Sequence, residues 1–199
     1  MPFDPTYPLP LKLRQRIQHW ENDIPKTQFQ MYGPLNNYFY EKFPGKLIKP
    51  QALFRDEVDP ANPGPGRLSI DSMGAVTTDE TKLYPDFAIC SYGPRVNGNF
   101  PPDVVHLIVE VGSLGADLNK NSAEDRRHIT DQLKGYLRKV GPFTNRSVGG
   151  TRGVAILGLE MCVISWVHGQ TGWYMRKDVN WSSIYGPRWD TTMEHVAQL

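Results

Sequence analysis

Apolar residues in the middle and later parts of the chain gather into continuous runs. The runs are YPDFAIC at 84–90, VVHLIVEV at 104–111, GVAILGL at 153–159 and CVISWV at 162–167. Short, mostly β-branched runs of this kind are typical of strands buried on both faces of a sheet. The pattern therefore predicts four central strands, with a tight turn around Glu160 and Met161 between the last two.

Between the second and third runs the apolar positions change to helical spacing. Ser122 followed by Asp125 approximates a capping box, which marks a helix start, and Gly141 with Pro142 marks its end. The predicted buried stripe of this 122–140 helix is Ile129, Leu133, Tyr136, Leu137 and Val140. The segment has the length of a right-handed crossover between two parallel strands.

Elements closer to the chain ends follow from weaker patterns. Helices are predicted at 11–24, at 34–43 with Pro34 in the first turn and Pro44-Gly45 as the stop, and at 191–199. The second of these helices should bury Leu35, Tyr38, Phe39 and Phe43. The sequence predicts an extended segment at 46–58, in which Pro50 favours a sheet edge or a bend, a loop at 59–66, and a short strand and turn at 67–74. The segment 180–189, NWSSIYGPRW, fits an exposed binding loop or a packed lid.

These elements predict an α/β fold with a mixed central sheet flanked by helices. We expect a single domain over 1–199, with an N-terminal helical segment at 1–45, an α/β core at 46–176 and a C-terminal tail at 177–199. The chain of 199 residues, 39% hydrophobic and 22% charged, has the size and composition of a globular domain.

Composition also bears on the cellular compartment and on the partners of the protein. A net charge of +1 does not by itself demand a nucleic-acid partner, and Cys90 and Cys162 both lie in apolar runs, which favours buried thiols. The proline-rich, charged N-terminus does not resemble a signal peptide, and no run reaches the ~18 apolar residues of a membrane span. We expect an intracellular protein, cytoplasmic or nuclear, with no membrane partner. Whether it forms a homodimer is left open.

Two carboxylates interrupt the predicted buried strands. Asp86 follows Pro85 at the start of one run, and Glu110 lies near the end of the next. A buried carboxylate is costly unless it is paired, hydrogen-bonded or bound to a metal. If the strands are neighbours, the two acids can share Mg²⁺ or Mn²⁺, which prefer oxygen ligands. Alternatively, Asp86 caps a turn and Glu110 pairs with an arginine.

Charge is distributed unevenly around these acids. From 126 to 152 seven residues are Lys or Arg and one is acidic, whereas from 56 to 86 seven are acidic and two are basic. The 122–140 helix also carries His128, Gln132 and Tyr136 at intervals of four, which places them on one helix face. Bases beside an acidic sheet end suit an enzyme that holds a phosphate backbone and a metal. A solvated basic helix face is the alternative.

In their order along the chain, three motifs resemble those of the PD-(D/E)xK nuclease superfamily. They are YPDFAI with its Pro-Asp pair, HLIVEVGS with its glutamate, and DQLKGYL with a Q-x-x-x-Y pattern at Gln132 and Tyr136. The resemblance covers roughly residues 34–176. It implies a restriction-endonuclease-like core and metal-dependent hydrolysis of phosphodiester bonds in DNA or RNA.

The resemblance also implies roles for individual residues. Asp86 and Glu110 would bind Mg²⁺ or Mn²⁺, with the Val111 carbonyl as a third ligand and Asp71, in the preceding SIDSMG, as a further acid. Gln132 and Tyr136 would contact the active site and the nucleic acid. The expected nucleic-acid-binding residues are Arg126, Arg127, Lys134 and Arg138.

Gly112 departs from the family pattern, which has a lysine two residues after the glutamate. A cation could reach the site from Lys120, Arg126 or Arg127; the reaction could run on the metal alone; or the domain could be an inactive module that binds nucleic acid or protein. His106 lies on the same side of its strand as Glu110, and packing is the favoured reading for it. A further alternative is a small-molecule enzyme or scaffold in which both acids form ordinary ion pairs, because fold alone does not determine function.

Overall fold

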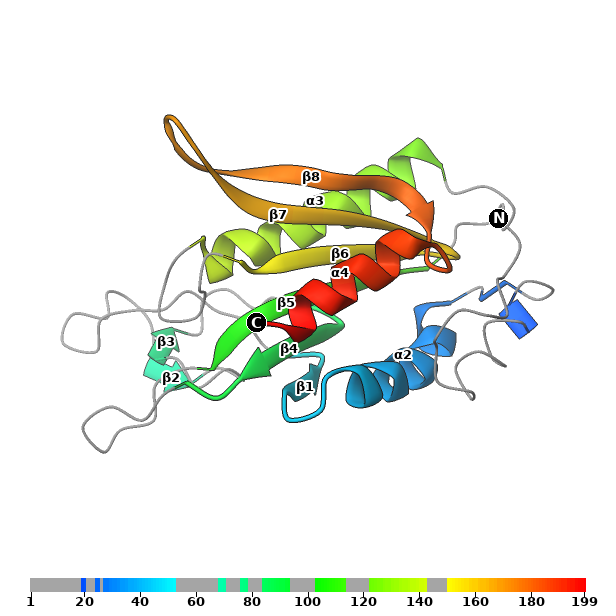
Figure 1. The fold of residues 1–199 in the computed structure, drawn as a ribbon, viewed down its shortest axis with the longest axis horizontal. Coiled ribbons are helices and arrows are strands. Elements are labelled where there is room, and N and C mark those ends of the chain that lie inside the picture. The colour runs from blue at the N-terminus through cyan, green and yellow to red at the C-terminus, as the bar shows by residue number, and fades with distance from the viewer. Residues whose placement is uncertain are drawn as a thin grey trace.

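The computed structural model describes residues 19–20, 24–25, 27–52, 84–93, 103–113, 122–142 and 150–199, together with the backbone of 68–70 and 76–78. The described helices are α2 (Gln28–Lys42), α3 (Ala123–Val140) and α4 (Pro187–Ala197). The main strands are β1 (Leu47–Pro50), β4 (Phe87–Ser91), β5 (Val104–Gly112), β6 (Arg152–Leu157), β7 (Glu160–Gly169) and β8 (Gly172–Ser183) (Figure 1). The short strands β2 (Leu68–Ile70) and β3 (Val76–Thr78) form a separate antiparallel pair.

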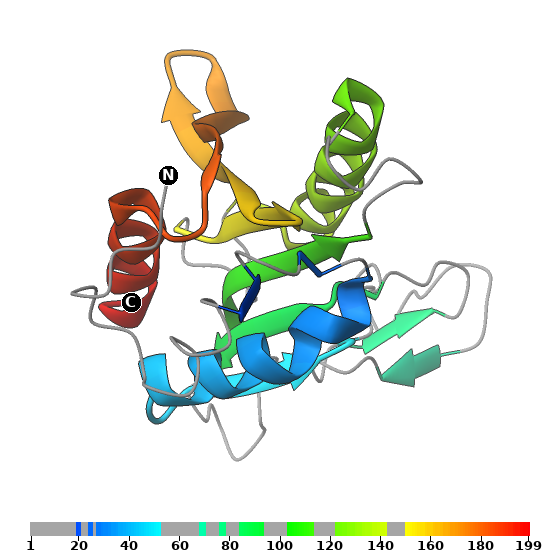
Figure 2. The same ribbon diagram turned by 90° about the vertical axis from the view of Figure 1, so that its right-hand side faces the viewer.

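One mixed sheet of six strands organises the molecule, in the order β1-β4-β5-β6-β7-β8. Strands β5 and β6 are parallel and are connected through α3, whereas every other neighbouring pair in this sheet is antiparallel. The predicted crossover and the α/β class are therefore confirmed. Helix α3 packs on one face of the sheet, and α2 and α4 pack on the other (Figure 2).

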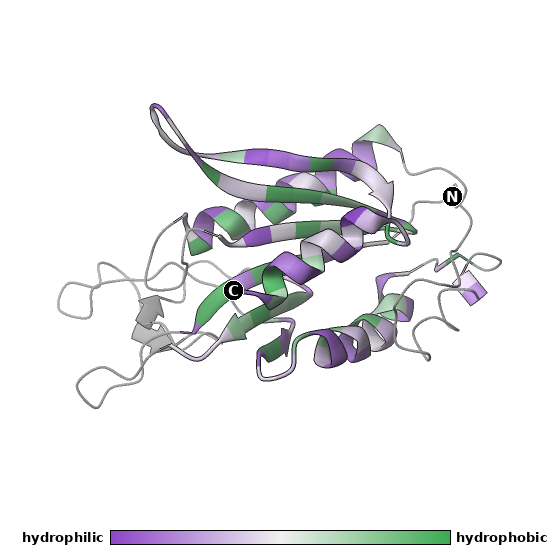
Figure 3. Cartoon of the chain, viewed as in Figure 1, coloured by the Kyte–Doolittle hydropathy of each residue, from purple (hydrophilic) through white to green (hydrophobic). Residues whose placement is uncertain are grey.

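Burial follows the hydropathy pattern most closely in the central strands. Seven consecutive residues of β5 are buried, as expected for a strand covered on both faces, and Figure 3 shows mostly hydrophobic positions along β4 and β5. Pro50 is the last residue of β1, which is an edge strand. Proline has no backbone N–H, and at an edge this absence does not interrupt the hydrogen bonding of a central strand. The edge position predicted from Pro50 is thus confirmed.

Helix α3 has the boundaries that its sequence predicts. The backbone N–H of Asp125 donates to Ser122 Oγ at 3.0 Å, and the Asp125 side chain accepts from the Ser122 N–H at 3.2 Å. Gly141 follows the last turn with a φ of +73°, a conformation that strongly favours glycine. All five residues of the predicted stripe are buried.

Helix α2 begins earlier than predicted, so Pro34 is an interior residue and not part of the first turn. The start is set by Thr27, whose backbone N–H donates to Gln30 Oε1 at 3.3 Å. Pro34 removes only one hydrogen bond, and the burial of Met31 and Leu35 on either side offsets that loss. The predicted buried residues Leu35, Tyr38, Phe39 and Phe43 all lie in the core.

Three further boundaries differ from prediction. The turn between β6 and β7 is at Gly158 and Leu159, because Gly158 adopts a φ of +58° and leaves Glu160 paired with Leu157. Strand β8 runs through residue 177, so the expected boundary between core and tail falls inside a strand. Helix α4 begins at Pro187, and buried Ile184 and Tyr185 pack the preceding segment into the core, so it is not an exposed loop.

Several predictions lie outside the described residues. Within the predicted 11–24 helix, His19 and Trp20 are described and are helical, whereas Ile24 is described and is not helical; the 59–66 loop and Asp71 are not described. The strand predicted within 67–74 is β2, which joins β3 and not the main sheet. None of the helices in the described part of the chain is both long and apolar enough to cross a membrane.

Candidate active site

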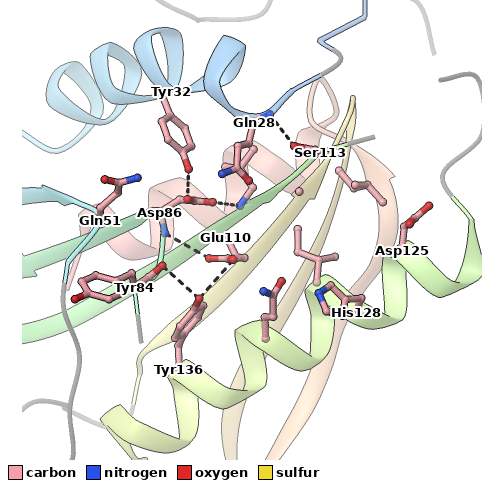
Figure 4. Close-up of a pocket in the computed structure, with 15 residues that line it drawn as sticks. Gln28, Tyr32, Gln51, Tyr84, Asp86, Glu110, Ser113, Asp125, His128 and Tyr136 are labelled. Carbon is pink, nitrogen blue, oxygen red and sulfur yellow. Dashed lines mark hydrogen bonds between the residues drawn. The ribbon is translucent and has the colours of Figure 1, made fainter. Parts of the chain in front are cut away.

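An open cavity of about 560 Å³ lies where β4 begins and β5 ends, between α2 and α3. Its lining comes from α2, the residues around the start of β4, the end of β5 and one flank of α3. The lining residues are Gln28, Tyr32, Gln51, Tyr84, Asp86, Glu110, Val111, Gly112, Ser113, Asp125, His128, Ile129, Gln132, Tyr136 and Leu157. Figure 4 shows the two carboxylates at the centre, with Tyr32 approaching from α2 and Tyr136 from α3.

Asp86 is buried and accepts hydrogen bonds from two different elements. The Val111 backbone N–H donates to Asp86 Oδ2 at 2.6 Å, and the Tyr32 hydroxyl donates to Asp86 Oδ1. Strand β4 begins at Phe87, so Asp86 satisfies a β5 N–H that has no β4 partner. Asp86 therefore does act as a structural cap, as the alternative interpretation proposed. The group it caps is the Val111 N–H on β5, not a group in a turn.

Glu110 is equally buried, but its hydrogen bonds are long. Glu110 Oε2 accepts from the Asp86 backbone N–H at 3.4 Å, and Oε1 accepts from the Tyr136 hydroxyl at 3.5 Å. The same hydroxyl lies 3.3 Å from the Tyr84 carbonyl oxygen. Neither carboxylate forms a salt bridge with a lysine or arginine among the residues described, so the expected pairing of Glu110 with an arginine is not seen there.

Burial without a neighbouring cation makes both carboxylates hard to ionise. Desolvation is the main cause that raises the pKa of Glu110 to about 8, and the charge of Asp86 adds to it. Desolvation also raises the pKa of Asp86, against hydrogen bonds from Tyr32 and Val111 that lower it. Burial and the nearby acids raise the pKa values of Tyr32 and Tyr136, so both phenols stay protonated and act as donors.

Helix α3 supplies the polar wall of the cavity. His128, Gln132 and Tyr136 line it together, as their spacing predicts, and Asp125 joins them one turn earlier. Tyr136 is buried, whereas His128 and Gln132 are exposed at the rim. This flank of the helix therefore combines an amide, an imidazole and a phenol beside two carboxylates.

Gly112 lies on the same side of β5 as Glu110, with α3 directly above it. A Cβ at this position would approach Leu157 Cδ1 to 2.8 Å and Ile129 Cδ1 to 2.9 Å. Both distances are shorter than ordinary carbon contacts, so a larger side chain requires both methyl groups to move. The space that the stem of the family lysine needs is occupied here by aliphatic side chains from α3 and β6.

The basic residues predicted to serve the site are placed elsewhere. Arg126 bonds Glu160 Oε2 at 2.6 Å on β7, and Arg127 is a solvent-exposed residue near Glu124. Neither lines the cavity, so the structure does not support either as a substitute for the missing lysine. Lys134 lines a different cavity, on the flank of α3 that also carries Arg126 and Arg127, and Lys120 lies outside the described residues. Arg138 is exposed on the surface of α3.

His106 is a packed histidine, in agreement with the favoured reading. It is buried near the other end of β5, and its Nε2 lies 2.8 Å from Ser91 Oγ. Burial lowers its pKa to about 4, so it is neutral at physiological pH. Glu110 is four residues away along the strand, which corresponds to ~13 Å.

Sequence reasoning missed the contributions of α2 and of the rim. Tyr32 contacts Asp86 across a separation of 54 residues, and Ser113 Oγ accepts from the Gln28 backbone N–H at 3.3 Å. The Gln51 backbone N–H donates to the Asp86 carbonyl at 2.8 Å. A tyrosine in an amphipathic helix carries no signal that separates a core residue from a partner of a distant acid.

The donor set of the cavity fits a hard divalent cation. Val111 lines the cavity, and its backbone N–H donates to Asp86 Oδ2 there. Two carboxylates and one backbone carbonyl are oxygen ligands of the kind that Mg²⁺ and Mn²⁺ take, with waters completing the shell. The described residues contain no group of three or more His, Cys, Asp or Glu side chains that could hold a metal.

Comparisons with known proteins give no guidance on this site. No protein-family model, no curated protein and no solved structure matches the chain significantly. The relation to the PD-(D/E)xK superfamily therefore stays a prediction that depends on the motifs and on the arrangement of the residues described above.

Proposed function

We propose that the protein is a divalent-metal-dependent phosphodiesterase that acts on nucleic acid. The observation that supports this most strongly is the convergence of Asp86 and Glu110 from adjacent strands into one cavity. No lysine or arginine lines that cavity among the residues described. Two buried acids without a cation are unfavourable, and a bound divalent ion would compensate both.

The fold supports the same proposal at a coarser level. Three neighbouring elements carry the motifs, in sequence order. Asp86 immediately precedes β4, and Glu110 lies on the adjacent strand β5. Gln132 and Tyr136 lie on α3, which packs against β5. This is the order in which the superfamily motifs occur. We infer a restriction-endonuclease-like core from it, with Asp71 as a further acid outside the described residues.

Each residue has a distinct part in the proposed reaction. Asp86, Glu110 and the Val111 carbonyl would hold Mg²⁺ or Mn²⁺. The ion would supply charge neutralisation at the phosphate and a lower pKa for water. The Tyr32 and Val111 hydrogen bonds fix the Asp86 carboxylate, Tyr136 orients Glu110, and the exposed Gln132 amide and His128 imidazole are placed to orient substrate or water.

One observation favours a second candidate, a catalytically inactive nuclease-like module that binds nucleic acid or protein. Gly112 offers no cation, and Ile129 and Leu157 occupy the space beside it. Such a module would keep the fold and lose the chemistry. It would not require Glu110 for function.

The two candidates separate in a paired assay of metal binding and cleavage. Mn²⁺ binding is measured by calorimetry, and cleavage is measured on fluorescent single- and double-stranded DNA and RNA with Mg²⁺ or Mn²⁺. We expect wild type to bind Mn²⁺ and cleave at least one substrate, and Glu110→Gln to lose roughly 100-fold or more in both, since a metal ion contributes several kcal/mol to such reactions.

Glu124→Gln is the matched control, because Glu124 is an exposed glutamate on α3 and does not line the cavity. It should bind Mn²⁺ and cleave as wild type does. Mn²⁺ binding without cleavage in wild type would support the inactive module. Mn²⁺ binding that is unchanged in Glu110→Gln would rule out the proposed metal site.

A further inference from the structure

A second concave surface lies between α3 and β8, on the flank of α3 that does not line the candidate active site. It encloses about 300 Å³. We call it the basic groove, and its lining residues are Ala123, Arg126, Arg127, Thr130, Asp131, Lys134, Lys177 and Trp181. Four of these side chains are cationic and one is acidic, so the lining has a clear excess of positive charge.

The register of β8 determines which of its side chains face the groove. Lys177 pairs with Ile164 and Met175 pairs with Trp166, and the indole of Trp166 donates to the Leu137 carbonyl of α3 at 3.1 Å. Cross-strand partners share a face of the sheet, so Lys177 faces α3. Its neighbour Arg176 points to the opposite face and bonds Asp178 at 2.8 Å.

The cations of the groove differ in how firmly they are held. Arg126 bonds Glu160 at 2.6 Å, and its guanidinium lies 5.6 Å from the centre of the Trp181 ring, so it is part of the wall. Lys134 forms a surface ion pair of 3.0 Å with Asp131. Lys177 is exposed and has no ion pair among the residues described.

Lys134 and Lys177 line the groove from opposite walls, one on α3 and the other on β8. Both lie close enough to Cys162 for their charges to lower the pKa of its thiol, although burial raises that pKa more strongly. Together with Arg127, these two ammonium groups form a cluster of cations in one groove that an anion can bridge. Trp181 adds an aromatic wall beside them.

We propose that the basic groove binds the phosphate backbone of a nucleic-acid strand, apart from the candidate active site. Positive grooves with aromatic walls are typical of surfaces that bind nucleic acid without reading its sequence. Helix α3 is about 10–12 Å across, so a strand held in the groove reaches the acidic cavity within a few nucleotides. The choice of nucleic acid among polyanions rests on the proposed function.

Equilibrium binding in EDTA tests the groove without cleavage. Fluorescence anisotropy is measured with the full chain and labelled single- and double-stranded DNA and RNA over a salt series. We expect Lys177→Glu to weaken binding about tenfold or more at low salt and to reduce the salt slope by about one. Lys134→Gln should weaken binding by a smaller factor in the same direction.

Arg176→Glu is the matched control, because it makes the same charge change one residue away on the opposite face of β8. This variant should change the binding affinity by less than about threefold. A change of that size is expected from the altered net charge alone, because salt screens exposed charges. Equal losses in Lys177→Glu and Arg176→Glu would overturn the groove as the binding surface. A wild-type protein that binds none of the four nucleic acids would overturn it as well.

Hydrolysis of bis(p-nitrophenyl) phosphate with Mn²⁺ separates this inference from the proposed function, because that small diester needs no groove. Lys177→Glu should hydrolyse it as wild type does, and a loss would contradict a separate groove. If wild type does not hydrolyse it, but nucleic-acid binding still distinguishes Lys177→Glu from Arg176→Glu, the groove stands and the proposed catalysis fails.

Discussion

The two flanks of α3 carry opposite charge and different degrees of burial. One flank faces a cavity that contains Asp86 and Glu110, both buried, with Asp125 at its edge. The other carries Arg126, Arg127 and Lys134 beside a groove that is open to water. Residues three and four apart share a helix flank, so a single helix of 18 residues separates the two environments.

This difference shows where charge affects stability and where it affects binding. Acids in a desolvated cavity interact strongly, and their protonation is linked to folding. Exposed cations are screened by water and salt, so they contribute little to folding but attract a polyanion in a salt-dependent manner. The predictions below change first the acidic flank, then the seam between the flanks, and last the basic flank.

The largest expected effect is on the pH dependence of stability at Glu110. Its pKa is raised from 4.5 to about 8 in the folded protein, so between these values the unfolded chain ionises Glu110 first. Stability should therefore fall as pH rises from about 5 to about 8, by at most about 4 kcal/mol. Glu110→Gln should remove this fall, as measured by urea unfolding in EDTA at several pH values. Glu124→Gln should retain it, and equal slopes in wild type and Glu110→Gln would contradict the pKa shift.

The next effect concerns the two donors that Asp86 satisfies. Asp86→Ala leaves the Val111 N–H and the Tyr32 hydroxyl without their acceptor and should cost about 2–4 kcal/mol in the free energy of unfolding. Asp86→Asn retains an acceptor and should cost less than half as much. Urea unfolding of both variants near pH 7 measures the difference. If the alanine variant were as stable as the asparagine variant, these hydrogen bonds would not contribute to folding.

Two glycines test the seam where α3 approaches the sheet. A Cβ on Gly153 would meet Leu133 Cγ, Leu133 Cδ1 and Leu137 Cδ1 at 2.9 Å. A Cβ on Gly112 would come closer than 3.0 Å only to the terminal methyl groups of Leu157 and Ile129. Gly153→Ala should therefore cost about 2 kcal/mol and Gly112→Ala about 1 kcal/mol. Thermal or urea unfolding gives the order. Adding Leu157→Val to Gly112→Ala should recover part of the loss, and no recovery would mean that the contact with Leu157 is not the cause.

The smallest expected effect is on the basic flank. Arg126 and Glu160 form a pair in which each side chain is about one-third exposed, so Glu160→Gln should cost less than about 1 kcal/mol. The loss should shrink further at high salt because screening weakens the pair. Unfolding at low and high salt measures it. A loss above 2 kcal/mol would show that the stacking of Arg126 on Trp181 depends on Glu160.

Local patterns predicted the elements that position the candidate site. The continuous run of β5, the capping box of α3 and the spacing of His128, Gln132 and Tyr136 each depend on residues close in sequence, and the structure shows the first two as predicted and places the three side chains in one cavity. The periodicity of α3 also places Arg127 and Arg138 away from Gln132.

The features of the candidate site that the sequence did not predict depend on contacts between distant segments. Tyr32 reaches Asp86 from a helix 54 residues earlier, and the surroundings of Gly112 come from Ile129 on α3 and Leu157 on β6. The early start of α2 was not predicted because proline is commonest in a first turn, whereas Pro34 follows the capping contact of Thr27 and Gln30 and lies inside the helix. The contact of Tyr32 with Asp86 and the crowding at Gly112 have no local signature, because their partners are distant in sequence.

Pro34 divides α2 in a way that bears on local opening. Because proline has no N–H to donate to the carbonyl of residue 30, one hydrogen bond is missing between the first part of the helix, which contains Tyr32, and the part that follows Pro34. The second part contains Leu35, Tyr38 and Phe39 in the core, whereas Met31 is the buried residue of the first. Amide hydrogen exchange should therefore be faster at 31–33 than at 38–42. The hydrogen bond from Tyr32 to Asp86 would then belong to the less protected part of α2, which opens locally while the rest of the domain stays folded.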